Sequence, residues 1–379
     1  MISSDNICEK SRNAGRSPAF EDISASIDLL RFPLIILIVF IHARFQGPDY
    51  PDSFTESFCK SVFFGIMPHC AVVAFFVISG YLFASKAEQR RSVETDRKEK
   101  FFSLYWRMLR SKSKSLLIPY LLWNTLVMLP HFLISVCGVS SPLLPDSKYA
   151  GMNFYQVLVR SYGLDMRVYP IDVPLWFVRS LMFFFLVSPA ILLLIRHLPK
   201  YVSFCLLLAG SVLTDDKAFL FFVFGIFFGC FDIDLRPLKK ILFLCLLPLP
   251  VFCLLCECFP SININLGSRV FLSLLNWFFL LFFFALAAGM KCLPENIRKW
   301  IVQAGGYSFW IFCSHAFVAT TITRIGLRVR CLGMSPPLWI VLDCIVTIAI
   351  TLAAFFVMRR VVPRMTRLLC GGRLPGKAA

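Results

Sequence analysis

Long, nearly uncharged stretches recur between residues 29 and 358 of this 379-residue chain. An α-helix needs about 20 predominantly apolar residues to cross the hydrocarbon core of a bilayer, and the stretches approach this length. They are continuously apolar rather than alternating, which excludes the strands of an outer-membrane barrel. We therefore predict an all-α integral membrane protein.

Charged residues, prolines and glycines divide this region into ten predicted transmembrane helices. We place them at residues 27–46, 61–85, 115–138, 174–195, 201–214, 217–232, 241–259, 269–290, 300–323 and 337–358. The fifth and sixth are short enough to form one re-entrant hairpin instead. The predicted organisation is an N-terminal tail over 1–26, a polytopic membrane domain over 27–358 and a basic C-terminal tail over 359–379. The first tail lacks the order of a cleavable signal, so we expect the first span to be retained.

Basic residues indicate the orientation, because Lys and Arg remain on the cytoplasmic side of a membrane. With the N-terminus inside, 27 of the 39 basic residues fall in cytoplasmic segments and nine in external ones. The external loop that carries Arg324, Arg328 and Arg330 is the exception. Both termini are therefore predicted to be cytoplasmic, in a multi-pass protein of the cell's inner membrane.

The net charge of +17 and the 15 cysteines point to neither nucleic acid nor a metal. The basic residues lie in short connections between apolar runs rather than on one soluble surface, so no nucleic-acid partner is expected. Most cysteines, such as Cys70 and Cys344, lie inside apolar runs without metal-ligand spacing. We expect them to be small buried hydrophobes, and we expect no bound metal.

Arg31 and His42 are two ionisable residues within the first predicted span. Eleven helical steps make three turns plus roughly 20°, so both side chains point the same way, about 16 Å apart along the axis. Intramembrane ionisable groups are functional candidates, and imidazole exchanges protons near neutral pH. His42 is thus a candidate general base on an acceptor hydroxyl. The alternative is that His42 only bonds to a neighbouring helix and Arg31 only reaches the interface.

Four further motifs accompany this pair: Ala74 to Leu82 with Ser79-Gly80, Arg107-Met-Leu-Arg110 before Pro119-Tyr120, Pro174-Leu-Trp176, and Gly306 to His315. Together with Arg31 and His42, they resemble the membrane-bound acyltransferase-3 family over residues 27–320. That resemblance implies an enzyme that moves an acyl group, often acetyl, from cytoplasmic acyl-CoA onto an extracytoplasmic carbohydrate. His42 and Arg31 match the family's essential histidine and the arginine eleven positions before it.

Arg107 and Arg110 match the family's paired arginines at the cytoplasmic start of a span. Two guanidiniums one helical turn apart suit the phosphates of CoA, the expected donor. Their alternative role is a positive-inside topology signal. Ser79 is a weaker donor-site candidate, since Ser-Gly also permits close helix packing.

Trp176 and His315 are weak candidates for acceptor binding. An aromatic side chain at the external mouth can stack on a sugar ring, but it also suits an interfacial belt. A lone imidazole such as His315 is more often a packing group. The external connection 139–173 contains an amphipathic stretch, Phe154 to Tyr162, that is expected to lie on the membrane surface and could cover the site.

The sequence departs from the family pattern in two ways, and it leaves one different class of function open. We expect a member without an appended soluble domain, and Pro33 follows the opening arginine closely where many relatives place a glycine or alanine just after it. The alternative function is a transporter of a glycan or lipid with Arg31 and His42 lining the pathway. The chain has no evident internal repeat to support a transporter.

Overall fold

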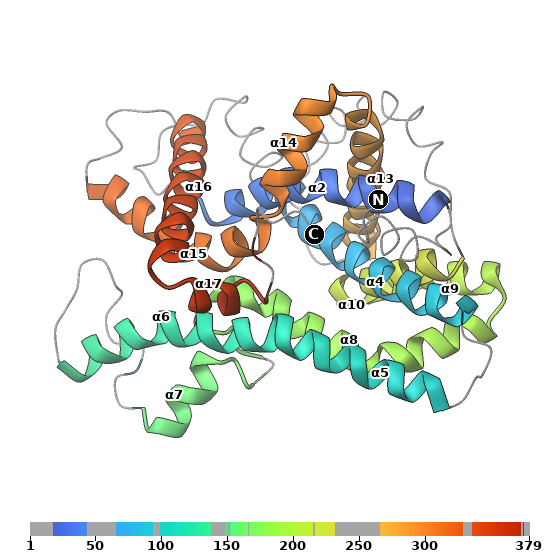
Figure 1. The fold of residues 1–379 in the computed structure, drawn as a ribbon, viewed down its shortest axis with the longest axis horizontal. Coiled ribbons are helices and arrows are strands. Elements are labelled where there is room, and N and C mark those ends of the chain that lie inside the picture. Colours follow the sequence, from blue (N-terminus) through green and yellow to red (C-terminus); the bar gives the residue numbers. More distant parts are fainter. Residues whose placement is uncertain are drawn as a thin grey trace, which may run out of the picture. The chain divides into compact units, whose positions relative to one another are not determined.

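The computed structural model describes residues 18–43, 66–93, 99–137, 149, 152–165, 167–214, 217–231, 266–328, 336–372 and 374. Every regular element within these ranges is helical, as predicted (Figure 1). The elements are α2 (Pro18–His42), α4 (Met67–Val93), α5 (Glu99–Lys112), the π-helix η2 (Ser113–Leu117), α6 (Ile118–Cys137), α7 (Phe154–Ser161), the 3-10 helix η3 (Val173–Leu175), α8 (Trp176–His197), α9 (Lys200–Leu213), α10 (Lys217–Cys230), α13 (Leu266–Met290), α14 (Glu295–Gly305), α15 (Ser308–Arg328), α16 (Pro336–Val361) and α17 (Pro363–Leu369).

Six helical segments in the described ranges are long and apolar enough to cross a membrane. They are Phe20–His42, Met67–Gln89, Tyr105–Leu133, Val173–His197, Ser273–Met290 and Leu338–Val361, and each overlaps a predicted span. The fifth and sixth predicted spans form α9 and α10, of 14 residues each. At 1.5 Å per residue these helices are about 21 Å long, below the roughly 30 Å of a bilayer core. The seventh predicted span, 241–259, lies outside the described residues.

The ninth predicted span, 300–323, is wrong as a single helix. The chain forms amphipathic α14, turns at Gly306 and Tyr307, and starts again at Ser308 as α15. Gly306 and Tyr307 close the turn with backbone hydrogen bonds to Gln303 and Ala304, both 3.1 Å long. The paired glycines at 305 and 306 allow the break, because they have weak helix propensity and no side chains to pack.

The described chain forms two compact units. Unit 1 contains residues up to Leu30, Cys70–Arg107 and Phe184–Lys299. Its α4 packs closely on α10 through glycines: a Cβ on Gly80 would lie 2.0 Å from the Phe222 carbonyl oxygen, and one on Gly225 would lie 2.1 Å from that of Val77. Such contact requires residues without side chains, as in many membrane helix pairs. This supports the packing role considered for Ser79-Gly80.

Aromatic rings fill the rest of this unit. Phe221, Phe222 and Phe224 of α10 are fully buried, and the Phe224 ring lies edge-to-face with Trp277 of α13 at a centroid distance of 4.3 Å. Two ion pairs tie its elements together. Arg196 lies 2.6 Å from Glu88, and Lys291 lies 2.6 Å from Asp22.

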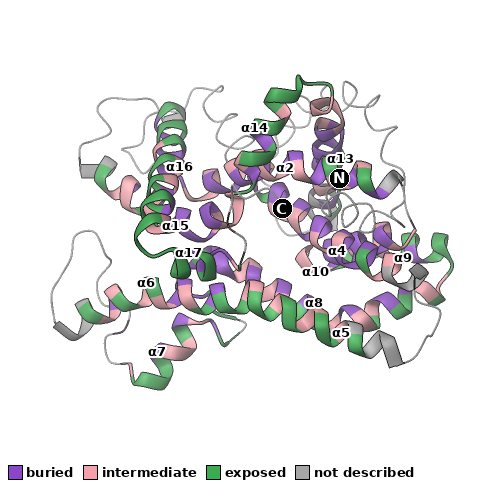
Figure 2. Cartoon of the chain, viewed as in Figure 1, coloured by how far each residue is buried: buried purple, intermediate pink, exposed green. Residues whose placement is uncertain are grey.

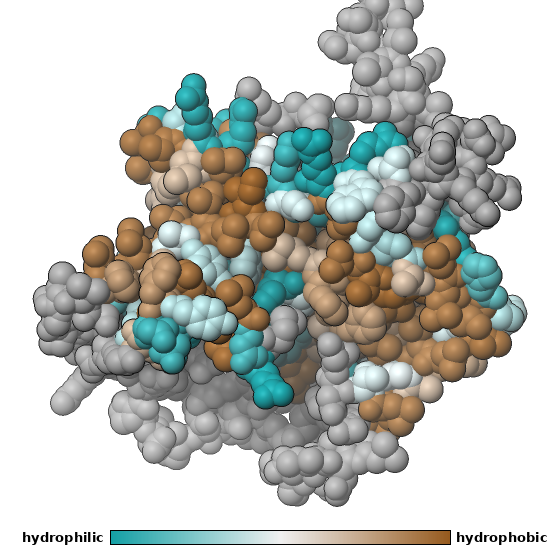
Figure 3. All heavy atoms as spheres, turned by 90° about the horizontal axis from the view of Figure 1, so that it is seen from below, coloured by the Kyte–Doolittle hydropathy of each residue, from teal (hydrophilic) through white to brown (hydrophobic). Residues whose placement is uncertain are grey.

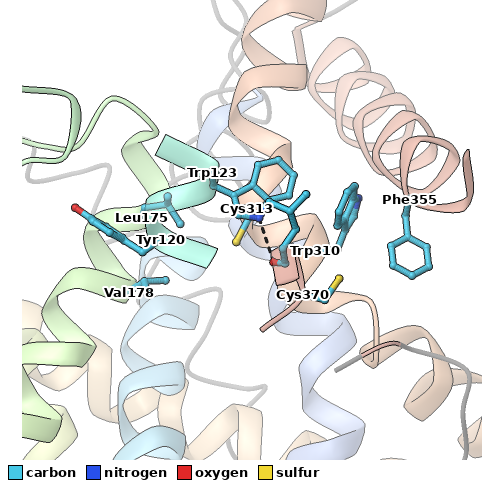
Figure 4. Close-up of a cluster of buried hydrophobic side chains, with 9 residues drawn as sticks. Tyr120, Trp123, Leu175, Val178, Trp310, Cys313, Phe355 and Cys370 are labelled. Atoms are coloured by element: carbon cyan, nitrogen blue, oxygen red, sulfur yellow. Dashed lines mark hydrogen bonds between the residues drawn. The ribbon is translucent and has the colours of Figure 1, made fainter. Parts of the chain in front are cut away.

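Unit 2 contains Arg31–His69, Met108–Phe183 and residues from Trp300 onward. Its buried core joins α6, α8, α15, α16 and α17 around two indoles (Figure 4). The rings of Trp123 and Trp310 meet edge-to-face at 5.1 Å. Trp123 Nε1 donates to the Leu369 carbonyl oxygen at 3.2 Å, and Trp310 Nε1 donates to that of Thr351 at 2.8 Å. Both buried indoles thus retain a polar partner.

Many helices carry residues that are exposed (Figure 2), and large hydrophobic residues are among them. Examples are Leu133, Leu186, Leu194 and Val357, each more than half exposed. Figure 3 shows such side chains gathered over wide parts of one face. A water-soluble protein rarely exposes apolar surface on this scale, whereas helices of a multi-pass membrane protein turn it toward lipid.

Candidate active site

The imidazoles of His42 and His315 lie together in unit 2. His42 is the last residue of α2, and His315 lies on α15. Their ring centroids are 5.0 Å apart and the ring planes make an angle of 66°. Two of the predicted site residues are therefore neighbours, although one of them was expected only as a packing or acceptor-binding group.

His315 is completely buried and its hydrogen-bonding state follows from its partners. Its Nδ1 lies 3.0 Å from the Ile311 carbonyl oxygen and 2.8 Å from that of Phe312. Because a carbonyl oxygen only accepts, Nδ1 carries the hydrogen, and the neutral ring presents Nε2 as an acceptor. Nε2 is buried without a hydrogen-bond partner among the described residues.

Arg31 lies on the same helix as His42, eleven residues earlier. Helix α2 continues through Pro33, so the predicted separation of about 16 Å along one face is retained. Both side chains are half-buried. Packing fixes the helix: Phe32 meets Trp300 edge-to-face at 5.4 Å, and the Cys344 thiol lies 3.9 Å from the Ile36 carbonyl oxygen.

Helix α15, which carries His315, is held against α16 by a buried carboxylate. Asp343 accepts hydrogen bonds from the Thr323 hydroxyl at 2.9 Å and from the Thr347 hydroxyl at 3.0 Å. Asp343 lies inside the last predicted span, 337–358. Both its oxygens are now satisfied, as a buried carboxylate requires, which indicates a structural role.

Arg107 and Arg110 lie one turn apart near the end of α5, and both are exposed. This exposure suits the capture of a soluble phosphate compound. Arg107 and Ser79 belong to unit 1, whereas the imidazole pair belongs to unit 2. Ser79 is half-buried beside the closely packed Gly80.

Arg179, in the first turn of α8, holds the segment that precedes this helix. Arg179 Nη1 donates to the carbonyl oxygens of Gly163, Val168 at 2.8 Å and Asp165 at 3.3 Å, which anchors the loop after α7. Helix α7 itself confirms the predicted amphipathic stretch and starts with a capping box between Asn153 and Gln156. The loop is thus a fixed structure beside α8.

A buried carboxyl group, Asp172, begins the turn into α8. Asn124 of α6 accepts a hydrogen bond from the Asp172 backbone N–H at 3.3 Å. Asp172 Oδ2 has no hydrogen-bond partner among the described residues, and burial raises the pKa of this carboxyl well above its usual value. Its place two residues before Pro174-Leu-Trp176 was the only sequence signal for it.

Trp176 lies at the start of α8, half-buried. Its ring meets that of Tyr169 edge-to-face at 6.5 Å, and Tyr169 is 62% exposed. The two rings form an aromatic corner on the anchored loop. This is an arrangement that can stack on a sugar ring.

Similarity to known proteins extends over the whole candidate site. Residues 24–356 match the acyltransferase domain of the acyltransferase-3 family. The chain is also similar to the succinoglycan biosynthesis protein ExoH of Rhizobium meliloti (strain 1021), with 26% identity over 372 residues that cover 94% of each protein. No solved structure matches it. The matched range contains every candidate residue named above.

Proposed function

Because this chain belongs to the acyltransferase-3 family, we propose that it transfers an acyl group from cytoplasmic acyl-CoA to a hydroxyl of an extracytoplasmic or lipid-linked carbohydrate. The match over residues 24–356 carries this proposal, since it spans the candidate site from Arg31 to His315. The relative named for succinoglycan biosynthesis supports a carbohydrate acceptor. Acetyl is the expected group, in an enzyme of the inner membrane.

In the proposed reaction His42 is the general base. It takes the proton of the acceptor hydroxyl as that oxygen attacks the thioester carbonyl carbon. The carbon–sulfur bond then breaks, and the His42 imidazolium returns the proton to the sulfur of CoA. The products are the acyl ester and free CoA. In the competing route His42 is acylated first. Incubation with acyl-CoA and no acceptor would then leave the acyl group covalently attached to His42.

Donor binding is assigned to the exposed arginines of α5. Arg107 and Arg110 would hold the CoA phosphates by charge-assisted hydrogen bonds, with Arg31 facing the same donor from α2. Ser79 is retained as a weaker contact near the thioester. The aromatic corner of Trp176 and Tyr169 would receive the sugar.

The first experiment measures acyl transfer by purified protein in proteoliposomes containing acetyl-CoA or succinyl-CoA. Mass spectrometry of surface glycans from cells with and without the protein names the acyl group and its acceptor. His42→Ala is expected to lower turnover by at least 10²-fold without loss of protein from the membrane. Retained turnover in this variant would remove His42 from the chemistry.

Donor binding is tested separately by calorimetry with acetyl-CoA. Replacing both Arg107 and Arg110 by Ala should weaken binding about tenfold or more and reduce its salt dependence. Lys114→Ala removes another exposed cation from the adjoining π-helix η2 and is the matched control. A donor dissociation constant unaltered in the double variant would exclude the phosphate clamp.

A further inference from the structure

We infer that His315 is a positioning residue for His42: its Nε2 accepts a hydrogen bond from the His42 ring and determines which His42 nitrogen faces the acceptor hydroxyl. This inference rests on the proposed role of His42 as general base. It assigns to His315 a task in the reaction that differs from packing and from acceptor binding.

His315 has one ring nitrogen, Nε2, that is not used in a hydrogen bond among the described residues. Its Nδ1–H points at the carbonyl oxygens of Ile311 and Phe312, so its tautomer is fixed by backbone of its own helix. The Nε2 lone pair is left buried and without a partner among the described residues. Burying an acceptor without a partner is unfavourable, and a nearby donor would remove this cost.

His42 can supply the missing donor. The His42 ring is 5.0 Å from the His315 ring, centroid to centroid, and tilted by 66°. Two ring radii of about 1.2 Å and a donor–acceptor distance of about 2.9 Å together span about 5.3 Å, close to this separation, so a turn of the His42 ring against the fixed His315 ring joins them by an N–H···N bond. The Ser314 hydroxyl, on the adjacent residue, already donates to the Trp310 carbonyl oxygen at 2.8 Å.

A hydrogen bond from His42 to His315 determines which His42 nitrogen can act as the base. A neutral imidazole has one donor and one acceptor nitrogen. Once His42 donates to His315, its other nitrogen is unprotonated and can act as the base. When that nitrogen takes the hydroxyl proton, the bond to His315 becomes charge-assisted and stabilises the imidazolium. The Ile311 and Phe312 carbonyls fix the tautomer of His315. Through its hydrogen bond with His42, His315 then fixes which His42 nitrogen acts as the base.

The test compares His315→Gln with His315→Asn. The longer Gln side chain can present an amide oxygen where Nε2 lies, whereas the Asn amide ends near the position of Nδ1. We expect His315→Asn to lower kcat by about 10²-fold with the KM for acyl-CoA within about threefold. His315→Gln should retain at least ten times the kcat of His315→Asn. Ser314→Ala, which removes a buried hydroxyl one residue away, is the matched control and should stay near wild type.

A double-mutant cycle separates positioning from general damage. If His315 acts through His42, adding His315→Asn to His42→Ala should cause no further loss of residual turnover. Any one of three results would overturn the inference. They are a wild-type kcat in His315→Asn, an equal loss of kcat in the Gln and Asn variants, and additive losses of turnover in the cycle. His315→Met, which fills the space without an equivalent acceptor, replaces the Asn variant if that protein does not accumulate. Full activity of His42→Ala would instead remove the proposed function on which the inference rests.

Discussion

The guanidinium of Arg179 donates to the backbone carbonyl oxygen of Gly163, sixteen positions earlier in the chain. Gly163 has a φ of +51°, and a Cβ there would lie 2.5 Å from Arg179 Nη1. A left-handed residue without a side chain therefore allows the arginine to reach the loop backbone. The same nitrogen also bonds the carbonyl oxygens of Asp165 and Val168, so one cation organises the turn through its backbone.

Arg179→Ala is expected to release this loop. Hydrogen bonds to charged groups contribute about 1.5–3 kcal/mol each, and those of one guanidinium are not additive. We therefore expect the free energy of unfolding to fall by about 2–4 kcal/mol. The measurement is thermal unfolding in detergent together with limited trypsin digestion after Arg160 and Arg167. Cleavage at these sites should accelerate at least tenfold, while acetyl-CoA binding remains unchanged.

The control for the loop is a substitution of an arginine that does not anchor it. Arg160 is exposed on α7, and its replacement by Ala should leave unfolding within about 0.5 kcal/mol of wild type. Cleavage after Arg167 is then the common readout. If Arg179→Ala is no more susceptible there than Arg160→Ala, the loop is held by other contacts.

Asp172 should make stability depend on pH. Burial raises the pKa of its carboxyl well above 3.8 in the folded protein. The contribution of Asp172 to the stability of the folded protein is therefore complete below about pH 3.8. It is lost as pH rises toward the folded pKa, because the unfolded chain releases this proton at lower pH. Asp172→Asn keeps the size of the side chain and abolishes its ionisation.

We accordingly expect Asp172→Asn to gain stability relative to wild type as pH increases from about 4 to 7, with a slope of at most about 1.4 kcal/mol per pH unit. Thermal unfolding at several pH values measures the difference between the two proteins. Asp165→Asn changes a carboxylate in the exposed part of the loop and is the control. A pH-independent difference between Asp172→Asn and wild type would mean that Asp172 is ionised throughout this range.

Much of the fold could be predicted because a bilayer demands long apolar helices, and such helices are visible in sequence without knowledge of their neighbours. The placement of Arg31 and His42 on one face followed equally from helical periodicity. Both depend on interactions within one segment. The capping box at Asn153 and the amphipathic α7 belong to the same local class.

Features that depend on helix packing could not be predicted. The approach of His315 to His42 requires α15 to lie beside the end of α2, and no local pattern encodes that contact. The three carbonyl partners of Arg179 depend on the turn that begins at Gly163. The break after Gly305 was missed because hydropathy continues across it, although the paired glycines were a usable signal.

Close packing of α4 on α10 predicts a reversal of the usual Gly-to-Ala effect. In an exposed helix this substitution stabilises by about 1 kcal/mol. A Cβ on Gly80 would instead meet backbone at 2.0 Å, so Gly80→Ala should destabilise by about 2–3 kcal/mol and reduce accumulation in the membrane. Gly210→Ala is the control, since its Cβ would meet only the flexible end of Leu220 at 3.0 Å. Equal accumulation and thermal stability of the two variants would contradict close backbone contact at Gly80.

The C-terminal helix α17 docks on the π-helix η2 through Gly371, and two adjacent glycines allow this contact to be isolated. Gly371 and Gly372 have φ values of +64° and +85°, so an alanine is strained at either position. A Cβ on Gly371 would lie 2.4 Å from the Ser115 carbonyl oxygen, whereas one on Gly372 would meet nothing within 4 Å.

Gly371→Ala should therefore destabilise the docked segment by about 1–3 kcal/mol more than Gly372→Ala, because overpacking is added to the shared backbone strain. The readout is maleimide labelling of Cys370 at pH 8, followed by peptide mass spectrometry. This thiol is buried, and burial raises its pKa to about 12, so it should react slowly while α17 remains docked. Labelling should accelerate about tenfold in Gly371→Ala and much less in Gly372→Ala. Similar labelling rates in the two variants would show that contact with Ser115 does not hold the C-terminal segment in place.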